Sequence, residues 1–110
     1  MIKRMSVVWK RPELSDAEFR QVWLGEHVTY AKKIPGVLEY VIDFATEGPS
    51  GSPAGIATLR FESRAALERA FSDPELNEHL RRTREQFART VQIIIVDEHQ
   101  VVPPVNRDGR

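Results

Sequence analysis

The fold is organised around the stretch from Ser15 to Gly36, which reads SDAEFRQVWLGEHVTYAKKIPG. Ser15 is followed three residues later by Glu18, a capping box that provides partners for the free amide donors at a helix start. Pro35 and Gly36 end the helix, because proline disfavours helical geometry in the residue before it and glycine supplies a turn. The apolar and aromatic residues between these signals recur with a helical period and form one face: Phe19, Val22, Trp23, Tyr30 and Ile34.

A histidine lies within this apolar face. His27 comes one helical turn after Trp23 and one turn before Ala31, which predicts that it faces the buried side of the helix. Three roles are open to a histidine in this position: a catalyst, an anchor for a ligand, or a packed residue that is hydrogen-bonded within the core.

Length and composition limit the classes of protein. A chain of 110 residues is normally one domain, and 41% hydrophobic residues are enough for one modest core. The formal net charge is zero, which argues against a nucleic-acid-binding protein. The absence of cysteine excludes disulfides and thiolate metal sites and fits a reducing compartment. No apolar run is long enough for a signal sequence or a membrane span, so a cytoplasmic protein is expected.

The pattern along the chain predicts four strands and two helices. Alternating or β-branched residues predict strands over 2–9, 37–44, 56–61 and 91–96. Helices are predicted from Ser15 to about residue 34 and from the cap Ser63 to about Arg89, the second restarting at Asp73-Pro74. The glycine- and proline-rich residues 46–55 form a loop, and residues 101–110 form a polar tail after a domain that covers 1–100.

The order β-α-β-β-α-β is that of the ferredoxin-like α+β fold, a four-stranded antiparallel sheet with both helices on one face. Yet both faces of the predicted strands carry apolar side chains, whereas a solvated face would be polar. A homodimer in which two sheets pack face to face is therefore expected. The alternative is a monomer with a few exposed aliphatic residues. The apolar sets on the two faces are Leu38, Tyr40, Ile42, Phe44, Val91, Ile93 and Ile95 against Val37, Val41, Ile94 and Val96.

Other side chains are weaker candidates for chemistry. Tyr40 could donate a hydrogen bond to a substrate, and Trp9 and Trp23 could stack on a flat ligand, although such aromatics more often pack in cores. Asp43 and Glu39 share a strand face that is expected to point away from the core. Arg60 and Arg4 could each bind a carboxylate by a bidentate contact, but surface arginines are common, so neither is singled out. The three histidines lack the spacing of a zinc site, and no glycine-rich phosphate loop is present, so neither metal nor cofactor is expected.

The chain resembles the EthD family of the dimeric α+β barrel superfamily over about residues 2–99. The residues that carry the resemblance are Lys10-Arg11-Pro12, the helix set Phe19, Trp23 and His27, then Ile34-Pro35-Gly36 and Tyr40. The second half is consistent with it through Gly55-Ile56-Ala57, Phe61-Glu62-Ser63, Ala66-Leu67 and Asp73-Pro74-Glu75.

The resemblance implies a homodimer with a pocket between each sheet and its own helices. Relatives in the superfamily include muconolactone isomerases, cofactor-free monooxygenases, polyketide cyclases and haem-degrading monooxygenases, so kinship does not choose the reaction. His79 resembles in location the haem-binding histidine of the last group. Those proteins also have an asparagine on the first strand, which this chain lacks, so haem binding is not expected.

The resulting hypothesis is a protein of catabolism or secondary metabolism with a small apolar pocket in each subunit. His27 matches the family's helix histidine and would act as general acid or base, with Trp23, Tyr30, Tyr40 and Trp9 as substrate-binding residues. The reaction would be that of a cofactor-independent isomerase, cyclase, lyase or monooxygenase. Two alternatives are a non-enzymatic binding or accessory protein of an oxygenase system and a structural dimer domain without a ligand.

Overall fold

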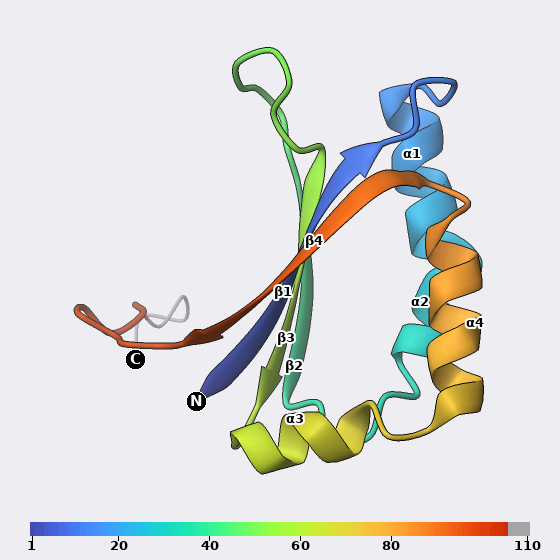
Figure 1. Ribbon diagram of the computed structural model, residues 1–110. Coiled ribbons are helices and arrows are strands. Elements are labelled where there is room, and N and C mark those ends of the chain that lie inside the picture. The colour runs from blue at the N-terminus through green and yellow to red at the C-terminus, as the bar shows by residue number, and fades with distance from the viewer. Residues whose placement is uncertain (106–110) are drawn as a thin grey trace.

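The computed structural model describes residues 1–105, and its elements follow the predicted β-α-β-β-α-β order (Figure 1). Each helical region is divided. The strands are β1 (Ile2–Lys10), β2 (Glu39–Phe44), β3 (Gly55–Phe61) and β4 (Ala88–Asp97). The helical elements are α1 (Asp16–Val22), a π-helical turn η1 (Trp23–His27), α2 (Val28–Ala31), α3 (Arg64–Ala70) and α4 (Pro74–Arg84).

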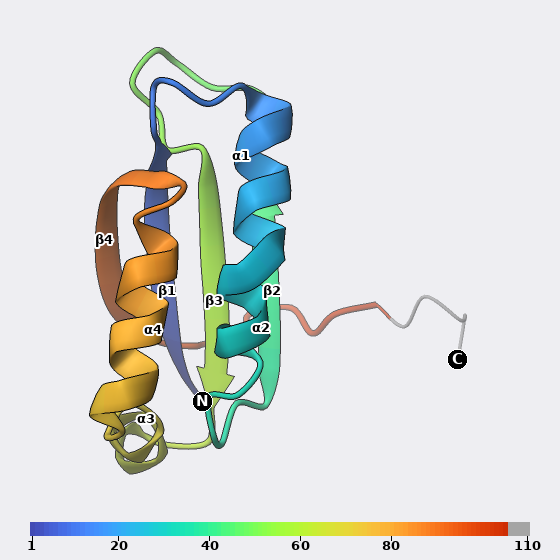
Figure 2. The ribbon, with the colours of Figure 1, turned by 90° about the vertical axis from the view of Figure 1, so that its right-hand side faces the viewer.

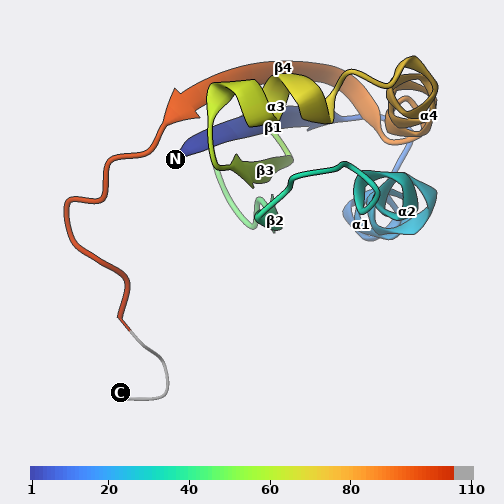
Figure 3. The ribbon, with the colours of Figure 1, turned by 90° about the horizontal axis from the view of Figure 1, so that it is seen from below.

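The strands form one antiparallel sheet in the order β2-β3-β1-β4. The segment α1–α2 lies in front of β2 and β3, and α4 lies in front of β1 and β4, all on the same face (Figure 2). The opposite face carries no helix from residues 1–105 (Figure 3). The ferredoxin-like fold predicted from the sequence is confirmed.

The predicted helix starts are confirmed by their hydrogen bonds. Ser15 and Glu18 form the reciprocal capping box of α1. Ser63 caps α3, and Asp73 caps α4 with proline at the first helical position. The predicted end near Arg89 is wrong: α4 ends at Arg84, because the chain must turn before β4 begins at Ala88.

Strand limits differ from prediction by a few residues. The second strand begins at Glu39, and Leu38, which was assigned to the core face, precedes it and is 55% exposed. β4 is longer than predicted because its pairing with β1 extends to both ends of that strand. On β2 the predicted inward face is otherwise confirmed, since Tyr40, Ile42 and Phe44 are more buried than their neighbours.

The first helix is not continuous. Gly25 has φ −86° and ψ −120°, outside helical geometry, and the turn from Trp23 to His27 is π-helical. Glycine weakens a helix interior. A π-helical turn contains an extra residue, so the buried face of α2 is rotated relative to that of α1. Trp23, His27 and Ala31 are nevertheless all buried, so the turn keeps them on the side that faces the sheet.

Two clusters of buried residues fill the space between sheet and helices. One is aromatic and lies under α1 and η1, where Trp23 stacks on Phe87 with ring centroids 4.8 Å apart and Phe19 meets both rings edge-on. The other is aliphatic and lies near α3 and α4. The two clusters meet at Tyr40, which packs against both.

The chain leaves the sheet after β4. Glu98 ties this end to the sheet through its backbone bond to the Met1 carbonyl, 3.0 Å, and through ion pairs with Lys3 and Arg60. Val101, Val102 and Val105 are exposed and lie outside regular structure. Part of the predicted tail, residues 106–110, lies outside the described residues. No helix in the described part of the chain has the length and apolar character needed to cross a bilayer.

Candidate functional site

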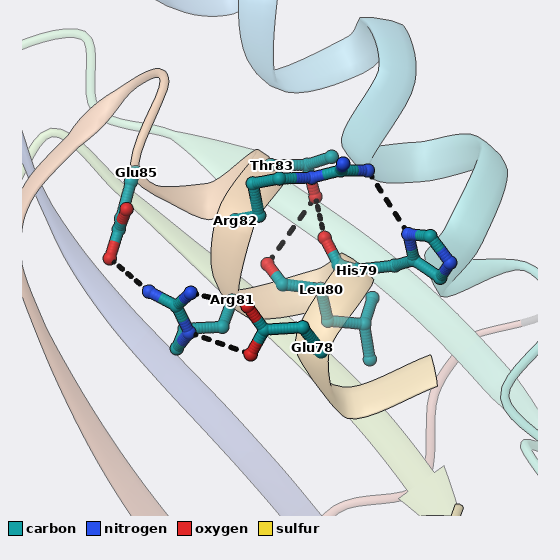
Figure 4. Close-up of polar contacts among 7 residues, drawn as sticks. All are labelled: Glu78, His79, Leu80, Arg81, Arg82, Thr83 and Glu85. Atoms are coloured by element: carbon teal, nitrogen blue, oxygen red, sulfur yellow. Dashed lines mark hydrogen bonds and ion pairs between the residues drawn. The ribbon is translucent and has the colours of Figure 1, made fainter. Parts of the chain in front are cut away.

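His27, the last residue of η1, is buried against α4, with 8% of its surface exposed. Its Nδ1 lies 2.8 Å from Oγ1 of Thr83. The Thr83 hydroxyl donates its own hydrogen to the His79 carbonyl at 2.8 Å, one helical turn earlier in α4 (Figure 4). The hydroxyl therefore accepts from His27, which fixes the hydrogen on Nδ1 and leaves the lone pair on Nε2.

The surroundings keep this imidazole neutral. Burial, together with the positive charges of Arg84 and Arg4, lowers the pKa of His27 to about 4, and the Leu80 backbone opposes part of the decrease. The ring is thus unprotonated at neutral pH and has a basic nitrogen ready without any prior proton loss.

His27 lines a small internal cavity of about 30 Å³, which has room for about one or two water molecules. The cavity lies between the sheet and the two helical segments. Its walls are mostly apolar and aromatic, with four polar side chains besides His27: Arg4 and Ser6 from β1, Tyr40 from β2, and Arg84 from α4.

The cavity adjoins an open pocket of about 320 Å³ on the side of α3 and α4. Four residues line both spaces: Arg4, Phe71, Leu80 and Arg84. Small-molecule sites usually have about 300–1,000 Å³, so the open pocket is of ligand size whereas the inner cavity is not. A ligand that approaches His27 from this pocket passes the two arginines.

The polar groups at the cavity are mainly donors. The Arg4 guanidinium lies over the Phe71 ring at 4.4 Å, and its Nη1 donates to Ser6 Oγ at 3.4 Å. The indole Nε1–H of Trp23 is buried and makes no hydrogen bond of normal geometry, although it lies close enough to the Tyr40 phenol to lower the pKa of that group. Burial raises the pKa of the Tyr40 phenol, while the side chain of Trp23 and the charge of Arg84 oppose the rise. Tyr40 is thus a neutral donor at neutral pH.

The structure brings together three of the five residues predicted for the site. His27, Trp23 and Tyr40 line the cavity. Tyr30 instead stacks on His79, with ring centroids 4.4 Å apart. Trp9 donates from Nε1 to the Gly51 carbonyl at 2.9 Å.

Trp9 also lines a separate open cleft of about 380 Å³ under the 45–54 loop. The substrate-binding roles of Tyr30 and Trp9 stay predictions that their positions do not support. Asp43 and Glu39 are exposed, as expected, and neither lines the cavity.

Sequence reasoning missed Arg84 and Thr83 and gave Arg4 little weight. A signal for Arg84 is present, because it follows Leu80 by one turn on the buried stripe of α4. Arg4 likewise shares a strand face with the buried Ser6 and Val8. Among residues 1–105 no three histidine, aspartate or glutamate side chains are grouped to hold a metal ion.

The EthD domain profile matches residues 11–90, which include α1, η1, α4 and most of the cavity wall. The chain belongs to the EthD domain family. Among curated protein sequences, none matches it.

Solved structures share the fold of this EthD-domain chain at low sequence identity. An ethyl tert-butyl ether D (EthD) family protein from Bacillus halodurans has a TM-score of 0.72 and 18% identity, over 90% of this chain and all of that one. SnoaB, a cofactor-independent oxygenase from Streptomyces nogalater, has a TM-score of 0.63 and 16% identity, over 94% and 97%. A dimeric ferredoxin-like protein from Thermobifida fusca has a TM-score of 0.66 and 10% identity, over 86% and 88%.

Proposed function

We propose that this EthD-family protein is a cofactor-independent enzyme that moves a proton on a small ring compound, with His27 as general base and then general acid. The observation that carries the proposal is the state of His27: neutral, held by Thr83 as the Nδ1–H tautomer, and facing a cavity beside a pocket of ligand size. A base of low pKa suits an acidic proton, such as that of a phenol or of a carbon next to a conjugated carbonyl.

The neighbouring groups support the same chemistry. When a proton leaves such a substrate, negative charge develops on its oxygen, and the donors of Tyr40 and Trp23 at the cavity can stabilise that charge. Transfer of the proton from Nε2 to another atom of the substrate completes an isomerisation or a cyclisation. The likeness to SnoaB adds cofactor-independent oxygenation as a further use of such a stabilised anion.

The experiment measures solvent exchange, which needs no knowledge of the product. Ring lactones and phenolic ketones are incubated with the protein in deuterium oxide, and deuterium uptake at carbon is followed by NMR. We expect His27→Gln to abolish exchange while the protein remains folded. Equal exchange in the variant and the wild type would overturn the proposal.

A second candidate is a binding or accessory protein without catalysis, and the small size of the inner cavity favours it. In this case His27 serves to join η1 to α4 through Thr83. The two candidates differ in what His27→Gln changes. The accessory role predicts that the variant melts at a lower temperature and that the wild type itself catalyses no deuterium exchange.

We also propose that the protein is a homodimer formed through the sheet face without helices. This face carries the side chains of Met5, Val7, Val41, Ile56 and Ile94. Val41 and Ile94 are 39% and 48% exposed and lie midway along the two edge strands, β2 and β4. The dimeric state of the Thermobifida fusca relative supports a second copy as the partner.

A further inference from the structure

Two arginines at the mouth of the cavity, Arg4 and Arg84, are partly buried and have no acidic partner among residues 1–105. The surface arginines are mostly paired with carboxylates, as in Arg60–Glu98 and Arg81–Glu78. Arg4 and Arg84 have no carboxylate within 4.0 Å among residues 1–105. Neither the cavity nor the open pocket has an aspartate or glutamate in its wall.

This arrangement is costly for the free protein. Burial and the charge of Arg84 together lower the pKa of Arg4 to about 10, and burial also lowers the pKa of Arg84. Both guanidinium groups still carry a charge at neutral pH. Two like charges taken partly out of water without a partner destabilise a protein, so such a pair indicates a site for a ligand that supplies the missing charge.

Trp23, which is 1% exposed, lies beside the Tyr40 phenol in the same cavity wall. Its Nε1–H is the buried side-chain donor without a partner in the described part of the chain, and it lines the same cavity. Because its interaction with the Tyr40 phenol falls short of a hydrogen bond, the indole can still donate to a ligand. Arginines from β1 and α4, the phenol of Tyr40 and this indole together offer many donors and few acceptors.

We propose that Arg4 and Arg84 form the receptor for a carboxylate, and that the ligand of the His27 pocket is a ring compound bearing that group. The inference rests on the proposed function, whose ligand class it names. The carboxylate lies between the two guanidinium groups, whose planar geometry suits it. The ring lies against Phe71 and Leu80, which line both the open pocket and the His27 cavity.

The same placement links binding to chemistry. The charges of Arg84 and Arg4 contribute to the low pKa of His27. A bound carboxylate offsets both charges, and no acidic side chain of β1, β2 or α4 lines the cavity to do so in the free protein. The ligand therefore makes the imidazole a stronger base at the moment when a proton has to be taken.

Benzoate is the probe, and benzamide is its uncharged control of nearly equal shape. Binding is measured by calorimetry and by tryptophan fluorescence for the wild type and for Arg4→Gln, Arg84→Gln and Arg82→Gln. Arg82 is the matched control, because it lies on the same helix but is exposed and pairs with Glu26 at 3.7 Å. Melting temperatures without ligand are recorded in parallel, and Arg84→Lys tests whether charge alone restores binding.

We expect benzoate to bind at least about tenfold more tightly than benzamide, and each glutamine variant of the pair to weaken benzoate by about tenfold or more. Arg82→Gln should bind as the wild type does. Without ligand, Arg84→Gln should melt at the wild-type temperature or above it, because an unpaired buried charge has been removed. A purely structural arginine would instead lower the melting temperature when replaced.

The proposal is overturned if benzamide binds as well as benzoate, if benzoate does not bind, or if the pair can be replaced without loss. If inorganic phosphate binds as tightly as benzoate, the inference that the ligand carries a ring is wrong. The same titration in His27→Gln separates the two proposals. If benzoate binds but deuterium exchange does not depend on His27, the carboxylate receptor stands and the catalytic role of His27 is wrong. If exchange depends on His27 but benzoate does not bind, the catalytic role stands and the receptor is wrong.

Discussion

His27 is the residue on which the proposed chemistry depends, and its burial makes a prediction about acid stability. Its pKa is about 4 in the folded protein and near 6.5 when unfolded, so the unfolded chain takes up the proton first. The stability that His27 contributes is complete above pH 6.5 and is lost as the pH falls towards 4. The loss is about 3 kcal/mol at most, because the side chain is nearly buried.

Urea unfolding at about pH 7 and about pH 5 measures this loss. His27→Gln should reduce the difference between the two conditions, whereas His79→Gln, a half-exposed neighbour, should not. The Glu98 carboxylate does not contribute to the difference between the two variants. Hydrogen bonds from Arg60 and Lys3 lower its pKa to about 2, so in the folded protein it titrates below the pH range of the measurement. An unchanged pH dependence in His27→Gln would contradict the assignment of a neutral, buried imidazole.

Thr83 makes a second prediction at this scale, as a positioning residue. Thr83→Val removes the acceptor of the His27 Nδ1–H while it keeps the shape, so it should cost about 1–3 kcal/mol. The imidazole nitrogens should also change their NMR shifts as the tautomer preference is lost. Thr83→Ser should retain both the stability and the shifts, and a similar effect in serine and valine would show that packing rather than the hydroxyl matters.

At the scale of elements, the close contact between β3 and η1 has a testable consequence. A Cβ added to Gly55 would lie 2.6 Å from Cζ3 of Trp23 and 3.2 Å from the Asp43 carbonyl. The indole cannot move aside because it is packed between Phe19 and Phe87. Gly55→Ala should therefore destabilise the protein by about 1–3 kcal/mol and disturb the cavity that Trp23 lines.

Chemical denaturation with tryptophan fluorescence measures this effect. Gly48→Ala is the control, because the Cβ added there meets the flexible side chain of Ser52 on an exposed loop. This control should stay within about 0.5 kcal/mol of the wild type. A Gly55→Ala protein as stable as the control would mean that the indole has room to shift.

The elements themselves were predictable because local signals agreed with the final packing. The capping box of Ser15 and Glu18 and the Asp73-Pro74 restart each depend on neighbouring residues only, and each is confirmed. The π-helical turn at Gly25 was not predicted. Its apolar spacing matches that of an ordinary helix, and its geometry depends on contacts with the sheet.

The candidate site was predictable where one element carried it. Trp23 and His27 share one helix face, so their joint burial followed from their spacing. Arg4 and Arg84 come from β1 and α4, far apart in the sequence. The local patterns indicate that each faces inward, but no local pattern indicates that the two lie at the same cavity. Their meeting is a property of the tertiary fold.

For the whole molecule, the face of the sheet without helices predicts the oligomeric state. Light scattering after size exclusion should give the mass of a dimer for the wild type. Ile94→Glu should give a monomer, because it places a charge among the apolar side chains of that face, midway along the edge strand β4. Ile93→Glu is the matched control, since Ile93 is nearly as exposed but pairs with Ser6 and so points to the other face.

Equal masses for the two variants would contradict an interface on this face. A monomeric wild type would contradict the dimer itself. Because the cavity lies on the helix side of the sheet, an Ile94→Glu monomer should still bind the benzoate probe.

The sheet order has a consequence for biosynthesis. The strand β1, near the start of the sequence, lies between β3 and β4, and β4 follows every other element. A nascent chain therefore cannot complete its sheet until Ala88–Asp97 has left the ribosome, and contacts between distant segments slow folding further. Until then one edge of β1 stays open, and this is the interval in which the chain has the greatest need of a chaperone.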